Sequence, residues 1–396
     1  MRLKSPGVDR RTGELVSAPT SVYMPCGTRR ASRCPACAKV YNGDAFQLLR
    51  RGLLQRHTNG ALPLFVTLTA PGAKVFGTRH HFRGRPGARQ CPCGTAHAEG
   101  DALLGAPINP AGFRYDRAVA WNAAAPELWR RFTVNLRRAF PDHDIEYARV
   151  VEFQRRGLVH VHAVVRIQVR EDGPSMPLPH LTTAKDRIRR AAGDVSFSSG
   201  GLDVPATWGS RTDVRPIVTR RPHRRPGEST KHYAARCRRS TDGQGAASYV
   251  AKYATKSPED TLAGTTGALR SHLMRLHDRA WSIASPKWRG RANLAEVLDG
   301  HNPSGEEWSY RVRMGRARTE AAAYGYGGQV LTKSRNYSTT FRALREARRI
   351  WATESRRTAG LPVVSLVWAV EGFGYLPTPD LVTDSTQPAA PSSPSP

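Results

Sequence analysis

The sequence predicts an α+β fold in which helices pack on a central antiparallel sheet. Two strand-like runs, residues 146–154 and 158–167, are joined by a three-residue loop, 155–157, that ends in glycine, and this spacing is typical of an antiparallel hairpin. A third run, residues 61–71, is short, apolar and rich in β-branched side chains, which favours a buried strand. We therefore expect a sheet that contains these three strands.

Helices are predicted before and after the hairpin. Residues 126–141 carry apolar side chains at helical spacing, with Pro126 in the expected first turn and Pro141 after the expected end. Residues 245–257 are also expected to form a helix, and the basic run at 339–351 is helix-like. Strands and helices of these lengths are consistent with helices packed on a sheet.

The charge balance favours a nucleic-acid partner. The 396 residues include 61 lysine and arginine side chains against 32 aspartate and glutamate, which gives a formal net charge of +29. Only nine of the 61 are lysine, and the forked arginine guanidinium suits bidentate contact with phosphate. No run approaches the ~18 apolar residues of a membrane span, so no membrane partner is expected. An N-terminus without an apolar signal segment and a low cysteine count predict a cytoplasmic protein.

The composition suggests four parts of the chain. Residues 1–60 contain a cysteine cluster and are expected to form a zinc-binding segment. Residues 61–260 hold the predicted sheet and carry an insertion at 72–110 that is rich in glycine, proline, arginine and histidine. Residues 261–375 are basic and expected to bind DNA, whereas the tail, 376–396, has almost no large apolar residue and is expected to be disordered.

A basic run lies between a glycine-rich turn and the last predicted helix. Such a run is usually a basic surface exposed to solvent. Because the whole chain is strongly basic, contact with the phosphates of DNA is at least as good an explanation here. The predicted DNA-binding residues are Lys333, Arg335, Arg342, Arg345, Arg348 and Arg349.

The second strand of the hairpin carries two histidines that share one face. Side chains alternate along a strand, so His160 and His162 project together. With a three-residue loop, Glu152 stands opposite His160 on the same face, whereas a two-residue loop would place Phe153 there. Two imidazoles and one carboxylate suit Mn²⁺, or Mg²⁺ with waters, when the substrate is a phosphate. The alternative is that the histidines are ordinary polar side chains of a strand.

The helix at 245–257 carries a second candidate group. Tyr249, Lys252, Tyr253 and Lys256 follow one another at three- and four-residue spacing and share one helical face. A phenol is a poor nucleophile unless its phenolate is stabilised, which neighbouring lysines and a divalent cation both do. Each tyrosine has a lysine three residues further on, so similar environments are expected for both. The alternative is that the tyrosines pack on the sheet and the lysines are solvated.

Five of the six cysteines fall in two clusters, which points to zinc rather than to free thiols. A C-x2-C pair and a later C-x-C pair together supply four thiolates, a set typical of a structural site. The preferred ligands are Cys34, Cys37, Cys91 and Cys93, with Cys26 and His97 as substitutes.

Three motifs in this order resemble those of the HUH endonucleases. They are LFVTLTA (64–70), HVH (160–162) and YVAKYATK (249–256), and the match is closest to rolling-circle replication initiators with two tyrosines. The runs CGTRRASRCPAC, VEFQRRGLVHVHAVVR and LTKSRNYSTTFRALR are similar to the actinobacterial, Streptomyces-type plasmid initiators.

The resemblance implies the HUH endonuclease fold and a nicking reaction at a plasmid origin. It implies that His160 and His162 bind the metal and that Tyr249 and Tyr253 are nucleophiles. Lys252 and Lys256 would then contact phosphate or phosphotyrosine. The product would be a 5′-phosphotyrosine and a 3′-OH primer.

The expected partners are origin DNA, single-stranded and duplex, and a host helicase and DNA polymerase, because the sequence contains no P-loop motif of a motor. Two alternatives stay open. One is a two-tyrosine transposase of the same superfamily, and the other is a non-catalytic, zinc-stabilised DNA-binding regulator.

Overall fold

The computed structural model describes most of the chain. The described residues are 25–54, 60–82, 90–170, 176–198, 204–218, 226–230, 232–233, 241–258, 262, 264–284, 319 and 321–359, with the backbone of six short strands nearer the two ends. They fall into two units, Thr28–Leu344 and a second formed by Met1–Gly27 with Arg345–Pro396. The tail predicted to be disordered, 376–396, lies outside the described residues.

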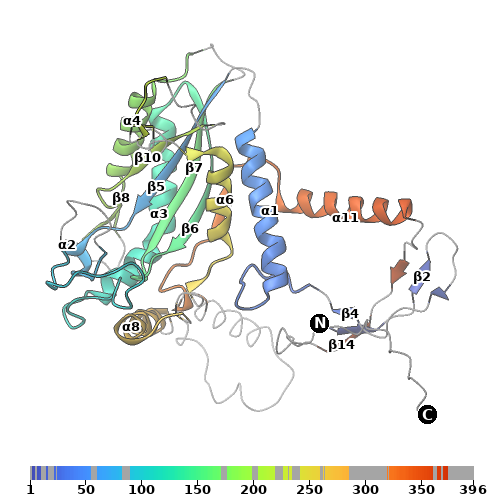
Figure 1. Ribbon diagram of the computed structural model, residues 1–396, viewed down its shortest axis with the longest axis horizontal. Coiled ribbons are helices and arrows are strands. Elements are labelled where there is room, and N and C mark those ends of the chain that lie inside the picture. Colours follow the sequence, from blue (N-terminus) through green and yellow to red (C-terminus); the bar gives the residue numbers. More distant parts are fainter. Residues whose placement is uncertain are drawn as a thin grey trace. The chain divides into compact units, whose positions relative to one another are not determined.

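A six-stranded sheet forms the centre of the first unit (Figure 1). Neighbouring strands are antiparallel from β10 to β12, and β11 joins the edge in parallel to β10. The strand order is β11 (Thr241–Asp242), β10 (Asp213–Val218), β5 (Ala61–Thr69), β7 (Val159–Val169), β6 (His143–Phe153) and β12 (Leu331–Lys333). The predicted antiparallel sheet with packed helices is therefore confirmed, and β7 is one of its two central strands.

Helices cover both faces of this sheet (Figure 1). On one face α3 packs with α4 and α8, and on the other α1 packs with α6. The helices that pack on the sheet are α1 (Pro35–Leu54), α3 (Tyr115–Ala139), α4 (Leu181–Gly193), α6 (Gly243–Ala254) and α8 (Gly267–Ala284). Two others are the short α2 (Ala73–Phe76) and α11 (Phe341–Thr358), most of which belongs to the second unit. The short strands β8 (Ser196–Phe197) and β9 (Ala206–Thr207) pair apart from the main sheet.

Six further strands form two small sheets of the second unit. Their orders are β14-β1-β4 and β13-β2-β3. The strands are β1 (Arg2–Lys4), β2 (Gly7–Asp9), β3 (Leu15–Val16), β4 (Val22–Tyr23), β13 (Val364–Leu366) and β14 (Ala369–Gly372).

The alternation of side chains along β7 decides which way the histidines point. Val161 and Val165 belong to the core beneath α3, whereas Val164 belongs to the core beneath α1 and α6. His160 and His162 share the even-numbered face with Val164, so they point toward the α1 and α6 side of the sheet. A central strand needs apolar residues on both faces, and these two histidines interrupt that pattern.

Helix α3 is longer than its sequence pattern predicts. It begins at Tyr115, and Pro126, predicted to lie in the first turn, is inside the helix. Proline removes one helical hydrogen bond, so the preceding turns must be held by other contacts. Trp121 and Asn122 supply them: the indole donates to Thr207 O at 2.8 Å, and the Asn122 amide donates to Gly157 O at 2.9 Å.

A buried arginine ties α1 to the sheet. Arg166 on β7 is only 2% exposed and forms an ion pair with Glu146 on β6. Its guanidinium also donates to the main-chain oxygens of Gly52 and Tyr337. The Tyr337 hydroxyl in turn donates to Leu49 O in α1 at 3.2 Å.

Replacing Arg166 by methionine should destabilise the protein by about 3–5 kcal/mol, because the Glu146 carboxylate would stay buried without its partner. Urea unfolding followed by circular dichroism would measure this loss. The matched control is Arg189→Met, which removes the exposed pair with Asp186 (3.1 Å) and should change little. If both substitutions lowered the free energy of unfolding equally, the buried ion pair would contribute no more to stability than the exposed one.

Candidate metal and tyrosine site

The hairpin between β6 and β7 has the predicted register. Gln154 N donates to Leu158 O at 3.0 Å, and Gly157 takes a positive φ of 76° in the turn. Glu152 consequently stands opposite His160, as the three-residue loop requires. A Cβ at position 157 would also lie 2.3 Å from Leu276 of α8, so both the conformation and the space favour glycine there.

Glu152, His160 and His162 form a compact group of possible metal ligands. The Glu152 carboxylate lies 2.8 Å from His162 Nε2 and 3.9 Å from His160 Nδ1, and the two imidazole centroids are 4.6 Å apart. One ligand atom from each residue lies within 4.8 Å of the others. His160 Nε2 is buried and has no hydrogen-bond partner among the described residues. A buried nitrogen without a hydrogen-bond partner is available to coordinate a metal ion.

Two neighbouring side chains orient these imidazoles. Thr67 on β5 pairs directly with His162 across the sheet, and its hydroxyl lies 3.2 Å from His162 Nδ1. The Gln154 amide lies 3.3 Å from His160 Nδ1. Thr67 belongs to the strand motif that the sequence singles out, but its role becomes visible only from the pairing of β5 with β7.

The protonation states suit metal binding. Burial and the neighbouring His162 lower the pKa of His160 to about 4, so its imidazole is neutral at neutral pH. Burial alone would raise the pKa of Glu152, but its hydrogen bond to His162 and the two imidazoles hold that pKa below its ordinary value. A neutral imidazole and an ionised carboxylate are the forms that bind a cation.

Helix α6 places both predicted tyrosines beside His162. The Tyr249 and Tyr253 ring centroids lie 5.1 and 5.6 Å from that of His162, and 4.9 Å from each other. The side of α6 that faces the sheet and α1 is built largely from small residues, which allow this close approach: Ala246, Ala247, Val250, Ala251 and Ala254.

The two tyrosines do not have the similar environments expected from the sequence. Tyr249 is 40% exposed, whereas Tyr253 is only 9% exposed. Burial raises the pKa of both phenols, and the Tyr249 hydroxyl and Glu152 raise that of Tyr253 further. Lys252 and Lys256 both lie over the Tyr253 ring, with Nζ at 6.0 and 5.2 Å from its centroid.

Arg215 is a basic neighbour of Tyr249 that the sequence analysis missed. It lies on β10 opposite Phe65, whose ring contacts both Tyr249 (5.8 Å) and His162 (5.7 Å). The Arg215 charge favours the Tyr249 phenolate, although burial outweighs it in the pKa. Residues around β10 show little hydrophobic periodicity, so the sequence contained no signal for this placement.

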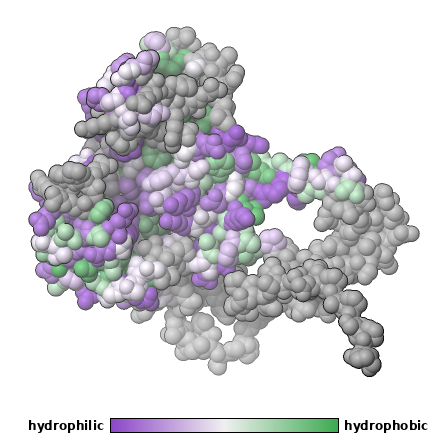
Figure 2. Space-filling model, viewed as in Figure 1, coloured by the Kyte–Doolittle hydropathy of each residue, from purple (hydrophilic) through white to green (hydrophobic). Residues whose placement is uncertain are grey.

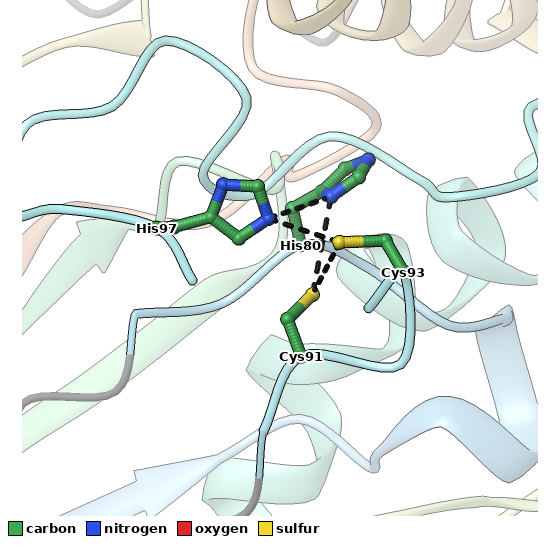
Figure 3. Close-up of side chains that lie close together, drawn as sticks. All are labelled: His80, Cys91, Cys93 and His97. Carbon is green, nitrogen blue, oxygen red and sulfur yellow. Dashed lines mark hydrogen bonds between the residues drawn. The ribbon is translucent and has the colours of Figure 1, made fainter. Parts of the chain in front are cut away.

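The structure divides the predicted zinc ligands. Cys34 and Cys37 lie at the N-terminus of α1, whereas Cys91 and Cys93 lie beside His80 and His97 in the loop after α2 (Figure 3). These two cysteine pairs do not come together in one site. Cys26 belongs to the second unit of the chain.

The predicted DNA-binding residues lie on β12, the following turn and α11. Lys333 is half-buried, which lowers its pKa, and its ammonium donates to Ser334 O and Arg335 O at 3.1 and 2.9 Å. The four predicted arginines of α11 are all exposed: Arg342, Arg345, Arg348 and Arg349. Hydrophilic and apolar side chains stand side by side along this helix (Figure 2), and Trp351 is 69% exposed. DNA binding by these residues stays a prediction.

No helix in the described ranges has the length and apolar character needed to cross a membrane.

Comparisons with known proteins agree with the resemblance of the motifs. A family model, RepSA, described as "Replication initiator protein, pSAM2", matches residues 1–386. The chain is also similar to a replication initiator protein of Streptomyces ambofaciens, with 33% identity over 414 aligned residues that cover 93% of this chain and 82% of the relative. No solved structure matches this chain significantly.

Proposed function

This chain belongs to the pSAM2 family of actinobacterial plasmid replication initiators, and we propose that it starts replication by nicking one strand of origin DNA with a tyrosine. One observation carries the proposal. Helix α6 holds the phenol rings of Tyr249 and Tyr253 within about 6 Å of the His162 imidazole, which itself belongs to a candidate metal site. A nucleophile beside a phosphate-activating site is the arrangement that strand cleavage requires.

The residues present fit a divalent ion, Mg²⁺ or Mn²⁺, held by Glu152, His160 and His162. Their donor set of two nitrogens and one carboxylate oxygen suits Mn²⁺, and the unpartnered, buried His160 Nε2 supports a ligand there. Bound in this position, the ion would polarise the scissile phosphate. Thr67 and Gln154 hold the two imidazoles in place.

In the proposed reaction, the hydroxyl oxygen of Tyr249 or Tyr253 forms a bond to the phosphorus while the bond from phosphorus to the 3′ oxygen breaks. The phenol loses one proton and the departing oxygen gains one, so a 5′-phosphotyrosine and a free 3′-OH result. Lys252, Lys256 and Arg215 supply the positive charge that a phosphoryl group in transfer requires.

Two tyrosines allow two successive strand transfers. The second hydroxyl can cleave the regenerated origin while the first remains joined to DNA. The 3′-OH freed by this second cut then attacks the first phosphotyrosine, which closes the circle and restores the first tyrosine hydroxyl. The 3′-OH serves as the primer for a host DNA polymerase. A host helicase would separate the strands, because the sequence has no P-loop.

A covalent-adduct assay tests this function. Purified protein, a labelled single-stranded origin oligonucleotide and Mn²⁺ should give a protein–DNA product that survives denaturing electrophoresis. Without a divalent ion the product should be absent. Tight binding to origin duplex with no adduct under any metal condition would overturn the proposal and favour a non-catalytic DNA-binding regulator.

Replacing Thr67 by valine should weaken Mn²⁺ binding by about 10–100-fold, because the partner that fixes the His162 ring is lost. Electron paramagnetic resonance of free Mn²⁺ would measure the affinity. The matched control is Thr69→Val on the same strand, since the Thr69 hydroxyl donates to Arg211 O at 2.8 Å and contacts neither histidine ring by a hydrogen bond. Equal affinities for the two variants would show that Thr67 has no positioning role.

A further inference from the structure

Four side chains outside the tyrosine site converge in the loop that follows α2 (Figure 3). His80 Nδ1 lies 3.1 Å from His97 Nε2 and 3.9 Å from Cys91 Sγ. Cys93 Sγ lies 3.3 Å from Cys91 Sγ and 3.2 Å from His97 Nε2. We propose that these four residues form a Cys2His2 zinc centre.

The spacing of the four atoms fits one tetrahedral ion. Zinc–sulfur bonds of about 2.3 Å and zinc–nitrogen bonds of about 2.0–2.1 Å place neighbouring ligand atoms roughly 3.3–3.8 Å apart. Four separations between these ligand atoms are 3.1, 3.2, 3.3 and 3.9 Å, close to that range. Cys91 and His97 are buried at 4% and 5% exposure, so the centre is shielded from water on one side. Four protein ligands leave no open position, which is typical of a structural site.

A carboxylate orients one of these ligands. His97 Nδ1 lies 2.7 Å from Asp101 Oδ2, so its Nε2 is the nitrogen that faces the two thiols. The other Asp101 oxygen accepts from Leu103 N at 2.8 Å, which fixes the carboxylate. A carboxylate behind a ligating histidine is a usual feature of zinc sites and supports zinc over four fortuitously close side chains.

The centre lies in a loop that packs against the turn of the histidine hairpin. His80 is held by main-chain hydrogen bonds to Ala106 (2.9 Å) and Gly105 (3.0 Å). Gly105 is so close to Arg155 in the turn that a Cβ would lie 2.9 Å from the Arg155 Cβ. Bound zinc would therefore stabilise the loop that packs against the β6–β7 turn. The free energy of zinc binding would then contribute to the stability of the fold.

Zinc content and ligand identity test this proposal without reference to nicking. His80→Ala should lose one zinc per chain relative to the wild type, as measured by elemental analysis, and its thermal midpoint should fall. The neighbouring substitution His81→Ala should keep the wild-type zinc content. Cys34→Ser with Cys37→Ser should keep one zinc whose X-ray absorption shows two sulfur and two nitrogen ligands.

Replacing His80 by another zinc-binding residue distinguishes two roles for this position, that of a zinc ligand and that of a side chain that only stabilises the fold. His80→Cys should retain the zinc and add one sulfur to its coordination sphere. Retention of all zinc in folded His80→Ala, or no added sulfur in zinc-loaded His80→Cys, would overturn the assignment. Either result would leave the proposed nicking reaction untouched, because none of these four residues belongs to the tyrosine site.

Discussion

Replacement of His162 by alanine is expected to abolish nicking and to leave binding to duplex origin DNA nearly unchanged. His162 lies at the centre of the candidate site, with Glu152 on one ring nitrogen at 2.8 Å and Thr67 near the other at 3.2 Å. Loss of a metal ligand should cost more than the roughly 100-fold that loss of an outer partner costs. Duplex binding is expected to depend on arginine–phosphate contacts spread over the surface. Adduct yield and filter binding would measure the two effects.

The control is His277→Ala, which removes a half-buried histidine of α8 that pairs with Asp278. It should nick at the wild-type rate. Chelation of divalent ions should reproduce the His162→Ala result in the wild type, and added Mn²⁺ or Mg²⁺ should restore activity. A His162→Ala protein that nicks as fast as the wild type would exclude this histidine from the catalytic site.

The hairpin and its histidines could be predicted because local geometry determines them. The period of two along a strand puts His160 and His162 on one face, and a three-residue loop ending in Gly157 sets the register that brings Glu152 opposite. Each of these statements depends on residues within one short segment. For the same reason the strand at 61–69 and the helix that carries the tyrosines follow from sequence alone.

Features that depend on packing between distant segments could not be predicted. His80 is separated by ten residues from Cys91, and only the path of the loop brings their side chains together. Arg215 reaches Tyr249 because β10 pairs with β5, a pairing that leaves no local pattern. The unequal burial of the two tyrosines likewise depends on how α6 packs between the sheet and α1, which equal spacing along one helix does not reveal.

This unequal burial predicts that the two tyrosines act in a fixed order. Tyr249 is 40% exposed and can meet a DNA strand directly, whereas Tyr253 is 9% exposed beneath both lysines. We expect Tyr249→Phe to reduce the first cleavage by at least about 1,000-fold, because a hydrolase that loses its nucleophile loses roughly a millionfold in rate. Tyr253→Phe should leave most of the first cleavage and block the second strand transfer. Quenched time courses with one and with two origin oligonucleotides would separate the two steps.

The double substitution Tyr249→Phe with Tyr253→Phe is the control for folding. Phenylalanine keeps the ring contacts with His162 and removes only the hydroxyls, so this protein should bind Mn²⁺ and duplex DNA normally and form no adduct. Mass spectrometry of the DNA-linked peptide from the wild type should place the first adduct on Tyr249. Equal labelling of both residues in a single turnover would contradict a fixed order, because it would mean that the shielded phenol reaches the phosphate as readily as the exposed one.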